Sequence, residues 1–203
     1  MLKDSSQIIK LDGKNVFVDV REAFIIDKVV MQFRRYDQSL AKGSKITSSV
    51  DFYLSLEDFS YLCYVLYSGG INKLLQKQSY TVYGGSIRNG KVVSRILKIE
   101  GGQDDKFFVK AQSGPGKKTQ TGAITPAFEK PETEIVIRLS SEQLKKLGLS
   151  GERALRIRDM WVAMGVLEEK CEALRFENRK TERPAPVSAH APAFDGNAAL
   201  DLF

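Results

Sequence analysis

Two stretches of alternating apolar and polar residues, 50–54 and 135–139, predict strands with one buried face, because successive side chains of a strand point to opposite sides. Each stretch leads into a segment with helical spacing, and residues 50–62 align with residues 135–147 without a gap. The apolar strand positions are Val50, Phe52, Leu54, Ile135, Ile137 and Leu139. The pattern therefore predicts that one strand-and-helix block occurs twice.

Both helices are expected to begin at a serine. Ser55 with Asp58, and Ser140 with Gln143, have the spacing of a capping box. In that motif the serine oxygen accepts a hydrogen bond from an amide near the helix start, and the later side chain reaches back. Behind each cap, apolar residues three apart predict a helix face that packs on the sheet. These residues are Phe59 and Leu62 in the first block and Leu144 and Leu147 in the second.

Further strands are expected ahead of each block. They cover residues 15–20 and 29–36 in the first half, and residues 91–99 and 106–112 in the second. Turns are expected at residues 84–85, 89–90 and 101–102, a short second helix at residues 71–77, and a flexible hairpin loop at residues 112–119. Runs of strands followed by a helix predict an α+β fold of two tandem antiparallel-sheet units, each followed by a helix that covers one face.

A long helix is predicted over residues 152–179. Its apolar residues follow a three-four spacing, which is typical of a coiled-coil seam or of a helix docked in a groove. They are Ile157, Met160, Met164, Leu167, Cys171 and Leu174. The alternative is a helix that packs on its own domain, so self-association through this helix stays open at this point.

After Lys180 the composition changes to Pro, Ala and Ser, and three prolines in this segment disfavour regular structure. The segment is expected to be a flexible tether. It ends in the apolar and acidic residues Leu200, Asp201, Leu202 and Phe203, which is typical of a short docking peptide. The expected organisation is a first unit at residues 1–79, a second at 80–150, the long helix at 151–180 and the tail at 181–203.

Composition excludes several classes of protein. With 203 residues and 42% hydrophobic content, the chain can bury one fair-sized core or two small ones. No apolar run approaches the roughly 20 residues of a membrane span, and residues 1–10 lack a signal pattern, so we expect a cytoplasmic protein with no membrane contact. Cys63 and Cys171 are expected to be thiols. His190, the single histidine, lies in the tail without ligand partners, so we expect no metal and no cofactor.

Charge points to a binding role. The net charge is +6 and the pI is about 9.2, and the tail is more acidic than basic, so the folded part is more basic than the average. Excess positive charge favours polyanions. A histidine confined to the tail excludes Ser/His/Asp and Cys/His catalytic sets, and residues 112–119 lack the spacing of a phosphate-binding loop. The sequence therefore predicts a protein that is not an enzyme.

The order of strands followed by Leu-Ser-x-Glu at a helix start, at residues 54–57 and 139–142, resembles the Whirly and positive-cofactor-four superfamily of single-stranded-DNA-binding proteins. The resemblance covers roughly residues 15–149. It implies a unit made of a curved antiparallel sheet of four strands followed by a helix. Such proteins commonly pair two units, so two units in one chain would form a built-in pseudo-dimer.

The last five residues, Ala199 to Phe203, resemble the bacterial sliding-clamp-binding motif, which usually reads Gln-Leu-Asp/Ser-Leu-Phe and here has alanine in place of the glutamine. The same end is similar to the acidic, phenylalanine-terminated tails of bacterial single-stranded-DNA-binding proteins. Both resemblances imply a replication protein as the partner of the tail. The alternative is a tail that docks on its own fold.

Arginine beside tyrosine on an open sheet face suits a single strand, because the cation neutralises phosphate while the ring stacks on a base. Alternation in residues 29–36 leaves Gln32, Arg34 and Tyr36 together on the side away from the apolar residues. The full set of expected nucleic-acid-binding residues is Gln32, Arg34, Tyr36, Lys45, Tyr53, Arg88, Lys91, Arg95, Lys98, Lys106, Phe108, Lys110 and Arg138. Each has an alternative interpretation as a solvated strand residue that discourages aggregation.

The leading hypothesis is a sequence-tolerant single-stranded-DNA-binding protein of replication or recombination, encoded by a phage or a mobile element. A second hypothesis is an RNA-binding or transcription regulator of the same fold, because a stacking sheet does not exclude RNA. A third is an interaction adaptor that bridges partners through its long helix and tail without nucleic acid.

Overall fold

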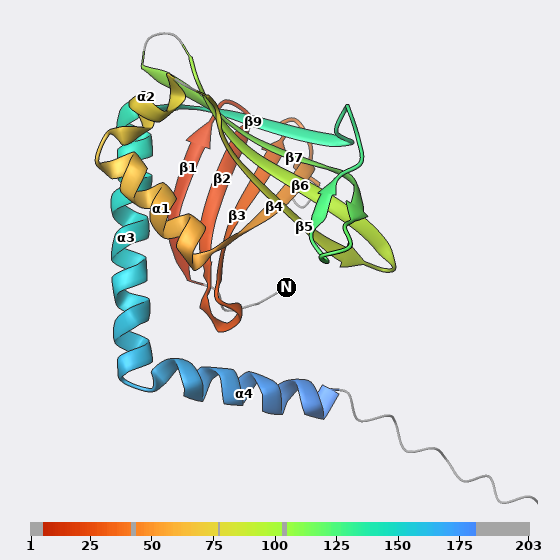
Figure 1. The fold of residues 1–203 in the computed structure, drawn as a ribbon, viewed down its shortest axis with the longest axis vertical. Coiled ribbons are helices and arrows are strands. Elements are labelled where there is room, and N and C mark those ends of the chain that lie inside the picture. The colour runs from red at the N-terminus through yellow and green to blue at the C-terminus, as the bar shows by residue number, and fades with distance from the viewer. Residues whose placement is uncertain (1–5, 42–43, 77, 103–104, 182–203) are drawn as a thin grey trace, which may run out of the picture.

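The computed structural model describes residues 6–41, 44–76, 78–102 and 105–181. The first half forms a four-stranded antiparallel sheet, which we call the first sheet (Figure 1). Its strands, in spatial order, are β1 (Gln7–Gly13), β2 (Val16–Ala23), β3 (Lys28–Tyr36) and β4 (Ile46–Ser55), with the 3-10 turn η1 (Phe24–Ile26) between β2 and β3. Helices α1 (Leu56–Tyr67) and α2 (Gly70–Leu75) follow β4.

The second half forms another antiparallel sheet, the second sheet, and again ends in helices. Its strands are β5 (Tyr80–Arg88), β6 (Lys91–Gly101), β7 (Lys106–Lys118), β8 (Ile124–Pro126) and β9 (Thr133–Ser140), and both β8 and β9 pair with β7. Helices α3 (Ser141–Ala163) and α4 (Val166–Thr181) complete the described chain. The predicted α+β class with two antiparallel curved sheets, each followed by helices, is confirmed.

Serines begin both sheet-covering helices, as predicted. At α3 the capping box is complete: the Gln143 amide donates to Ser140 Oγ at 3.2 Å, and the Ser140 amide donates to Gln143 Oε1 at 2.9 Å. At α1 the Asp58 amide donates to Ser55 Oγ at 3.1 Å, but the Asp58 carboxylate accepts from the Ser55 hydroxyl instead of reaching back to its amide. The first cap is therefore a serine cap without the reciprocal bond.

Several predicted boundaries are wrong. Strand β1 was not expected, the predicted turn at residues 84–85 lies inside β5, and the predicted loop at residues 112–119 is strand as far as Lys118. The predicted helix at residues 152–179 is not one separate element. Its first part continues α3, and Gly165, with a left-handed φ of 71°, separates α3 from α4.

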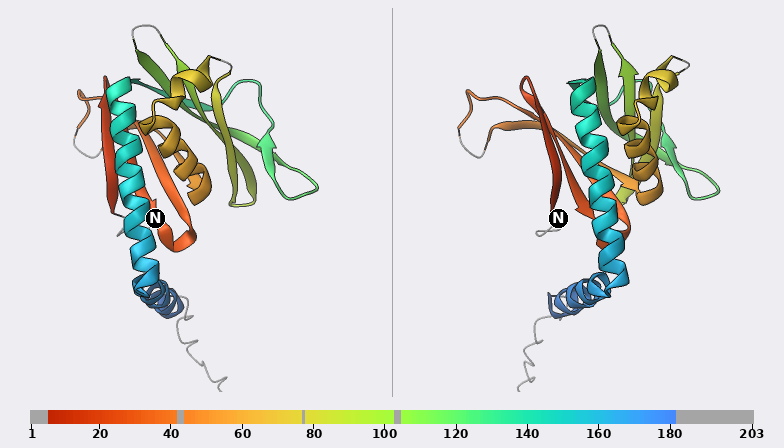
Figure 2. Two further views of the ribbon diagram at one scale, coloured as in Figure 1. Left: turned by 60° about the vertical axis from the view of Figure 1, so that its left-hand side comes forward. Right: turned by 90° about the vertical axis from the view of Figure 1, so that its left-hand side faces the viewer.

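A common hydrophobic core joins the two halves. The inner faces of both sheets and of α1 and α3 belong to one cluster of buried side chains. Phe52 of β4 is 1% exposed, and its ring lies 3.5 Å from where a Cβ on Gly84 of β5 would be. Gly13 of β1 lies similarly close to Ile137 of β9. Helices α1 and α3 pack against each other along one side of the molecule, next to the two sheets (Figure 2). The outer face of each sheet therefore points away from the shared core.

None of the helices in the described ranges combines the length and apolar character that a membrane crossing would need.

Candidate nucleic-acid interface

The predicted binding residues fall on separate surfaces rather than on one. Pairing register and burial place Gln32, Arg34, Tyr36 and Tyr53 on the outer face of the first sheet, and Lys98, Lys106, Phe108, Lys110 and Arg138 on the outer face of the second sheet. Arg88, Lys91 and Arg95 lie toward the tip of the β5–β6 hairpin, and Lys45 precedes β4. Because the inner faces share one core, the two outer faces are directed away from each other.

Arg95 lies on the core side of the second sheet and not beside Lys98. It is two residues from the fully buried Leu97, and its Nη1 donates to Ser86 Oγ of β5 at 2.8 Å. Lys98, three residues along, points to the opposite side, because side chains alternate along a strand. Arg95 therefore does not extend the cationic surface that carries Lys98.

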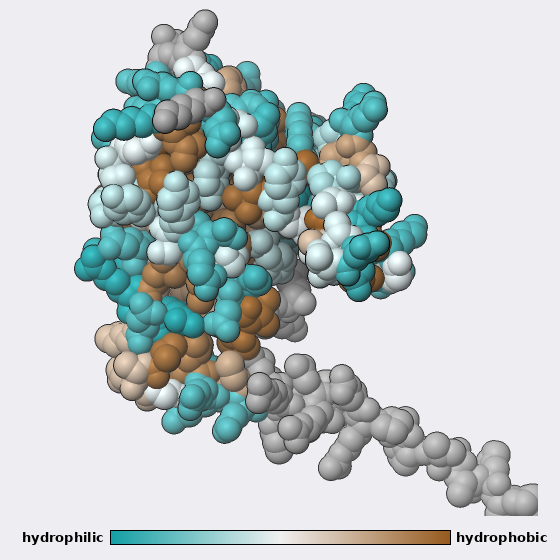
Figure 3. Space-filling model, in the orientation of Figure 1, coloured by the Kyte–Doolittle hydropathy of each residue, from teal (hydrophilic) through white to brown (hydrophobic). Residues whose placement is uncertain are grey.

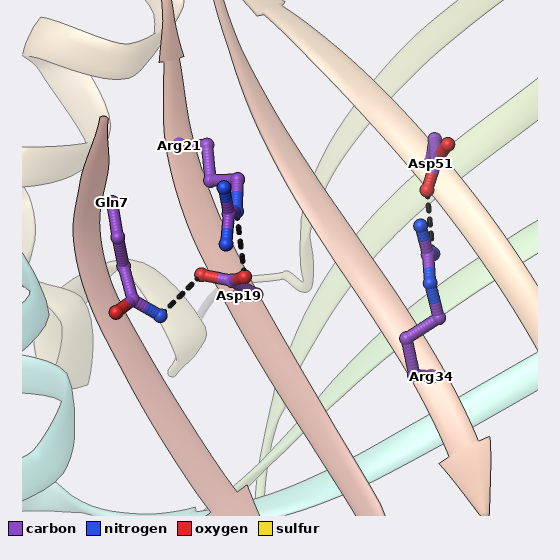
Figure 4. Close-up of polar contacts among 5 residues, drawn as sticks. All are labelled: Gln7, Asp19, Arg21, Arg34 and Asp51. Carbon is purple, nitrogen blue, oxygen red and sulfur yellow. Dashed lines mark hydrogen bonds and ion pairs between the residues drawn. The ribbon is translucent and has the colours of Figure 1, made fainter. Parts of the chain in front are cut away.

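Acidic side chains neutralise the outer face of the first sheet (Figure 4). Asp19 of β2 is only 7% exposed, although it lies on this face, and its carboxylate accepts from Gln7 Nε2 and Arg21 Nε, both at 2.7 Å. A buried carboxylate needs such donors, because its charge is otherwise expensive to remove from water. The centre of this face is therefore a hydrogen-bonded network.

A carboxylate also neutralises Arg34 on this face. Its Nη1 lies 2.5 Å from Asp51 Oδ1 of β4, and its side chain is 12% exposed. Lys10 and Asp12 form a third ion pair on β1, at 3.1 Å. The three cations of these pairs are matched by three carboxylates, so the face offers a polyanion little net attraction.

The aromatic residues of this face are partly occupied by neighbours. The Tyr36 ring lies 6.0 Å from the Phe17 ring, measured between centroids, and Lys10 Nζ lies 4.5 Å from the Phe17 centroid. Tyr53 is more open, with 46% of its surface exposed. The predicted residues Gln32, Arg34, Tyr36 and Tyr53 are thus brought together, but in a charge-balanced surface.

The outer face of the second sheet is different. Glu100 of β6, Phe108 of β7 and Arg138 of β9 lie side by side in the pairing register. The Arg138 guanidinium carbon lies 6.0 Å from the centroid of the Phe108 ring, which is a cation–π geometry. Arg138 and Lys106 are exposed, and neither takes part in an ion pair within the described ranges. An aromatic ring with unneutralised cations around it is a surface on which a base stacks while phosphates are neutralised.

Glu100 holds two further lysines on this face. Its carboxylate pairs with Lys98 Nζ at 2.6 Å and with Lys110 Nζ. The hydrogen bonds from Lys110 and then Lys98 lower the pKa of Glu100 below its ordinary value. The carboxylate therefore remains charged at neutral pH and cancels one of these two positive charges.

Four cationic side chains face two acidic ones on this surface, Glu100 and Glu134, so its net charge is positive. Glu134 accepts from Gln112 Nε2. At the far end of the sheet, Ile124 and Phe128 lie against Gly85, Gly114 and Gly116, where a Cβ on any of the three glycines would come within 3 Å of them. The segment between β7 and β9 thus covers one end of the outer face and leaves the Phe108 region uncovered by it.

Sequence reasoning missed Tyr83, which lies on the same outer face and is 63% exposed. Because a turn was predicted at residues 84–85, Tyr83 was not assigned to a strand face. Alternation in residues 80–83 was the available signal, because Tyr80 is buried at 8% and Tyr83 is exposed. Glu100 was missed because a sequence does not show which lysines face a carboxylate across a strand pair.

No group of three His, Cys, Asp or Glu side chains within the described parts of the chain is arranged to hold a metal ion. Leu200, Asp201, Leu202 and Phe203, the predicted docking peptide, lie outside the described residues. Comparison with known proteins gave no matching family model and no match among curated proteins.

Proposed function

We propose that this protein binds single-stranded DNA, without catalysing a reaction, through the outer face of its second sheet. The observation that carries the proposal is the Arg138–Phe108 pair, 6.0 Å apart, on an open sheet face with positive net charge. Stacking on an aromatic ring is tolerant of base identity, and cations track the phosphates. The role is in replication or recombination in the cytoplasm, with a replication protein as partner of the tail.

We also infer that the two halves are copies of one ancestral unit, as in the Whirly-like resemblance. In support, each half has an antiparallel sheet, of four strands in the first half and five in the second, and then a serine-capped helix. The equivalent positions Phe52 and Ile137 are both 1% exposed, and the other apolar strand positions of the aligned blocks, Val50, Leu54, Ile135 and Leu139, are 3%, 0%, 0% and 1% exposed. The copies then diverged in charge: ion pairs neutralise the first outer face, and the second keeps its net positive charge.

The direct test is titration of a fluorescent single-stranded oligonucleotide with the full chain at several salt concentrations, with duplex DNA and RNA as competitors. We expect binding that weakens as the salt concentration rises. Duplex DNA and RNA should compete with the single-stranded oligonucleotide less well than single-stranded DNA does. In the variant Lys106→Ala/Arg138→Ala, affinity should fall about tenfold, or roughly 1.4 kcal/mol. The salt slope should become shallower by about 1.4, because each lost phosphate contact removes roughly 0.7 for single strands.

Lys145→Ala/Lys146→Ala is the matched control, since it removes two exposed lysines from α3 and changes the net charge equally. Equal losses in both variants would mean that only net charge matters and would remove the second sheet as the site. Absence of binding at low salt would refute the proposal, and stronger competition by RNA would favour the RNA-binding hypothesis.

Glu100→Gln should strengthen binding. The change keeps the side-chain shape but frees the positive charges of Lys98 and Lys110, so affinity for the single strand should rise about threefold to tenfold and the salt slope should steepen by about 0.7. Because the pKa of Glu100 is lowered, the wild-type protein should show the same gain only below the ordinary glutamate range of about pH 4.3. A variant with unchanged affinity at neutral pH would show that these lysines do not contact the strand.

A further inference from the structure

A groove lies beside Tyr83 at the free end of the second sheet, and we call it the Tyr83 groove. Its volume is about 670 Å³, and residues of the edge strand β5 and of the segment around β8 form its walls. The lining residues include Tyr83, Gly84, Gly85, Gly122, Ile124 and Pro126. Apolar side chains lie among hydrophilic ones at this end of the sheet, on the right of the view (Figure 3). Concave surfaces lined by apolar residues are typical of ligand sites.

The Tyr83 side chain is accessible to a ligand. It lies on the outer face, because Gly84, its neighbour in the strand, faces Phe52 in the core and successive residues of a strand point to opposite sides. Its surface is 63% exposed, and no aromatic contact in the described part of the chain involves its ring. Tyr36, by contrast, meets Phe17 on the first sheet. The Tyr83 ring is therefore open to stacking by a flat ligand.

Strand β8 holds the opposite wall of the groove in place. The Thr125 hydroxyl donates to the Lys117 carbonyl oxygen at 3.3 Å, beside the backbone pairing of β8 with β7. Ile124 lies so close to Gly85 that a Cβ on this glycine would be 2.5 Å from it. A wall fixed by backbone pairing and close packing does not have to be ordered when a ligand binds. The groove is therefore preformed.

Charge identifies the class of ligand. Every side chain that lines the groove in the described structure is uncharged, and a cation lies at its rim. Lys118 Cε is 3.9 Å from the position that a Cβ on Gly122 would take. Lys118 is exposed, and no ion pair among the described residues engages it. An uncharged groove with an open ring and an unneutralised cation at its rim fits a nucleobase and the phosphate attached to it.

The strand register places Lys98 midway between Phe108 and Tyr83. Thr81 of β5, Lys98 of β6 and Lys110 of β7 lie side by side in one row. Phe108 comes two residues before Lys110, and β5 and β7 run in the same direction. Tyr83 comes two residues after Thr81, so it lies on the other side of the row. The two rings are thus two strands apart across the sheet and four residues apart along it, two on each side of the row, which is roughly 16 Å in a regular sheet.

We infer that the Tyr83 groove is a second base-binding position, and that one single strand of DNA crosses the outer face of the second sheet diagonally, from Phe108 over Lys98 to Tyr83. The inference rests on the proposed function and specifies the path of the strand on that surface. A base stacks on each ring, and Lys98 and Lys118 neutralise phosphates between and beyond the rings. Glu134, at the β9 end of the row that contains Tyr83, lies off this line.

The distance between the rings favours a single strand over a duplex. Stacked neighbours in a strand lie about 3.4 Å apart, so further nucleotides span the roughly 16 Å between the two bases. The faces of paired bases are covered in a duplex, whereas an unpaired strand can turn separate bases onto separate rings. Glu100 cancels one of the charges of Lys98 and Lys110, so one charge remains for the phosphates of these nucleotides.

The dependence of affinity on oligonucleotide length tests the inference. In a series of oligothymidylates of about 2–16 nucleotides, the affinity of the full wild-type chain should rise steeply at the length that reaches both rings. In Tyr83→Ala this rise should be lost. Affinity for the longest strands should then fall about tenfold, while affinity for strands that reach only one ring should change little. Phe108→Ala should weaken binding of the shortest strands as well, because most of the cations of this face lie around that ring.

Two controls separate stacking from structural effects. Tyr83→Phe keeps the ring and should bind like the wild type at every length. Tyr64→Ala removes a tyrosine that is 59% exposed on α1, away from the outer face of the second sheet, and should keep the rise with length. Circular dichroism verifies that each variant is folded.

The outcomes distinguish this inference from the proposed function. If Phe108→Ala weakens binding but the rise with length survives in Tyr83→Ala, the inference is overturned and the proposed function stands. If neither variant changes binding, the outer face of the second sheet is not the site, and both fail. A wild-type dimer that is lost in Tyr83→Ala, with unchanged affinity for every oligonucleotide, would show that a second copy of the chain occupies the groove and would also overturn the inference.

Photochemical cross-linking tests the path of the strand. An oligonucleotide with a single 5-iodouracil, moved along the strand from one sample to the next, should cross-link to Phe108 at one position and to Tyr83 at another, with further nucleotides between them. Cross-links to Phe108 without any to Tyr83 would place the strand on another path and overturn the inference.

Discussion

Replacing Phe52 by alanine is expected to lower the free energy of unfolding by about 3–5 kcal/mol, the range for a phenylalanine deleted from a packed core. Phe52 is 1% exposed in β4, and its ring reaches Gly84 in the other sheet. The cavity would thus open where the two halves meet, and both sheets would lose contacts. Since small domains have only about 5–15 kcal/mol of stability, this single change should remove a large share of it.

The measurement is urea denaturation followed by two signals. Circular dichroism reports all helices and strands, and the fluorescence of Trp161, the single tryptophan, reports the contact of α3 with Phe24. The two transitions should coincide in the wild type and shift together in the variant, because one cluster of buried residues spans both halves. Tyr53→Ala is the control, since Tyr53 adjoins Phe52 but is 46% exposed on the outer face, and its cost should stay below about 1 kcal/mol. Two separated transitions would show that the halves unfold independently.

The strand faces could be predicted from sequence because burial is periodic. Val50, Phe52 and Leu54 are 3%, 1% and 0% exposed, and the matching residues of β9 are buried to the same degree. The sequence-based prediction of strand β7 ended too early, because Gly114, Pro115 and Gly116 have the composition of a loop. In the structure these residues pair with β6 or β8. The glycines are there because Ile124 and Phe128 lie against them, which is a tertiary requirement that local propensity does not show.

The candidate site was only partly predictable for a related reason. Alternation correctly put Arg34 and Tyr36 on the outer side of β3, and Phe108 on the outer side of β7. Whether a cationic side chain is free to bind a phosphate, however, depends on which residues lie beside it on the neighbouring strands. The strand register places Asp51 within reach of Arg34 and places Arg138 beside the Phe108 ring. The sequence of one strand does not determine which residues of a distant strand lie opposite it. The charge difference between the two outer faces therefore emerges only from the fold.

The second large effect is expected at Gly148, where α3 crosses α1. A Cβ at this position would lie 2.8 Å from the Cys63 carbonyl oxygen and 2.8 Å from the Tyr67 amide nitrogen. Both are backbone atoms of α1, so no rotamer change relieves the contact and the helices must move apart. Alanine gains about 1 kcal/mol over glycine within a helix, but overpacking costs about 1–3 kcal/mol or more, and a rigid backbone neighbour puts this site at the upper end or beyond. We expect Gly148→Ala to lower the free energy of unfolding by about 2 kcal/mol.

The control for Gly148→Ala is Gly101→Ala at the exposed end of β6, where an added Cβ meets no atom within 4 Å of the described structure. Its unfolding free energy should stay within about 0.5 kcal/mol of the wild type. Urea denaturation of both variants decides the matter. If Gly148→Ala were as stable as the wild type or more stable, helix propensity would outweigh the contact and α1 and α3 would have room between them. A loss confined to Gly148→Ala would instead show that the close approach of these two helices, one from each half, holds the shared core together.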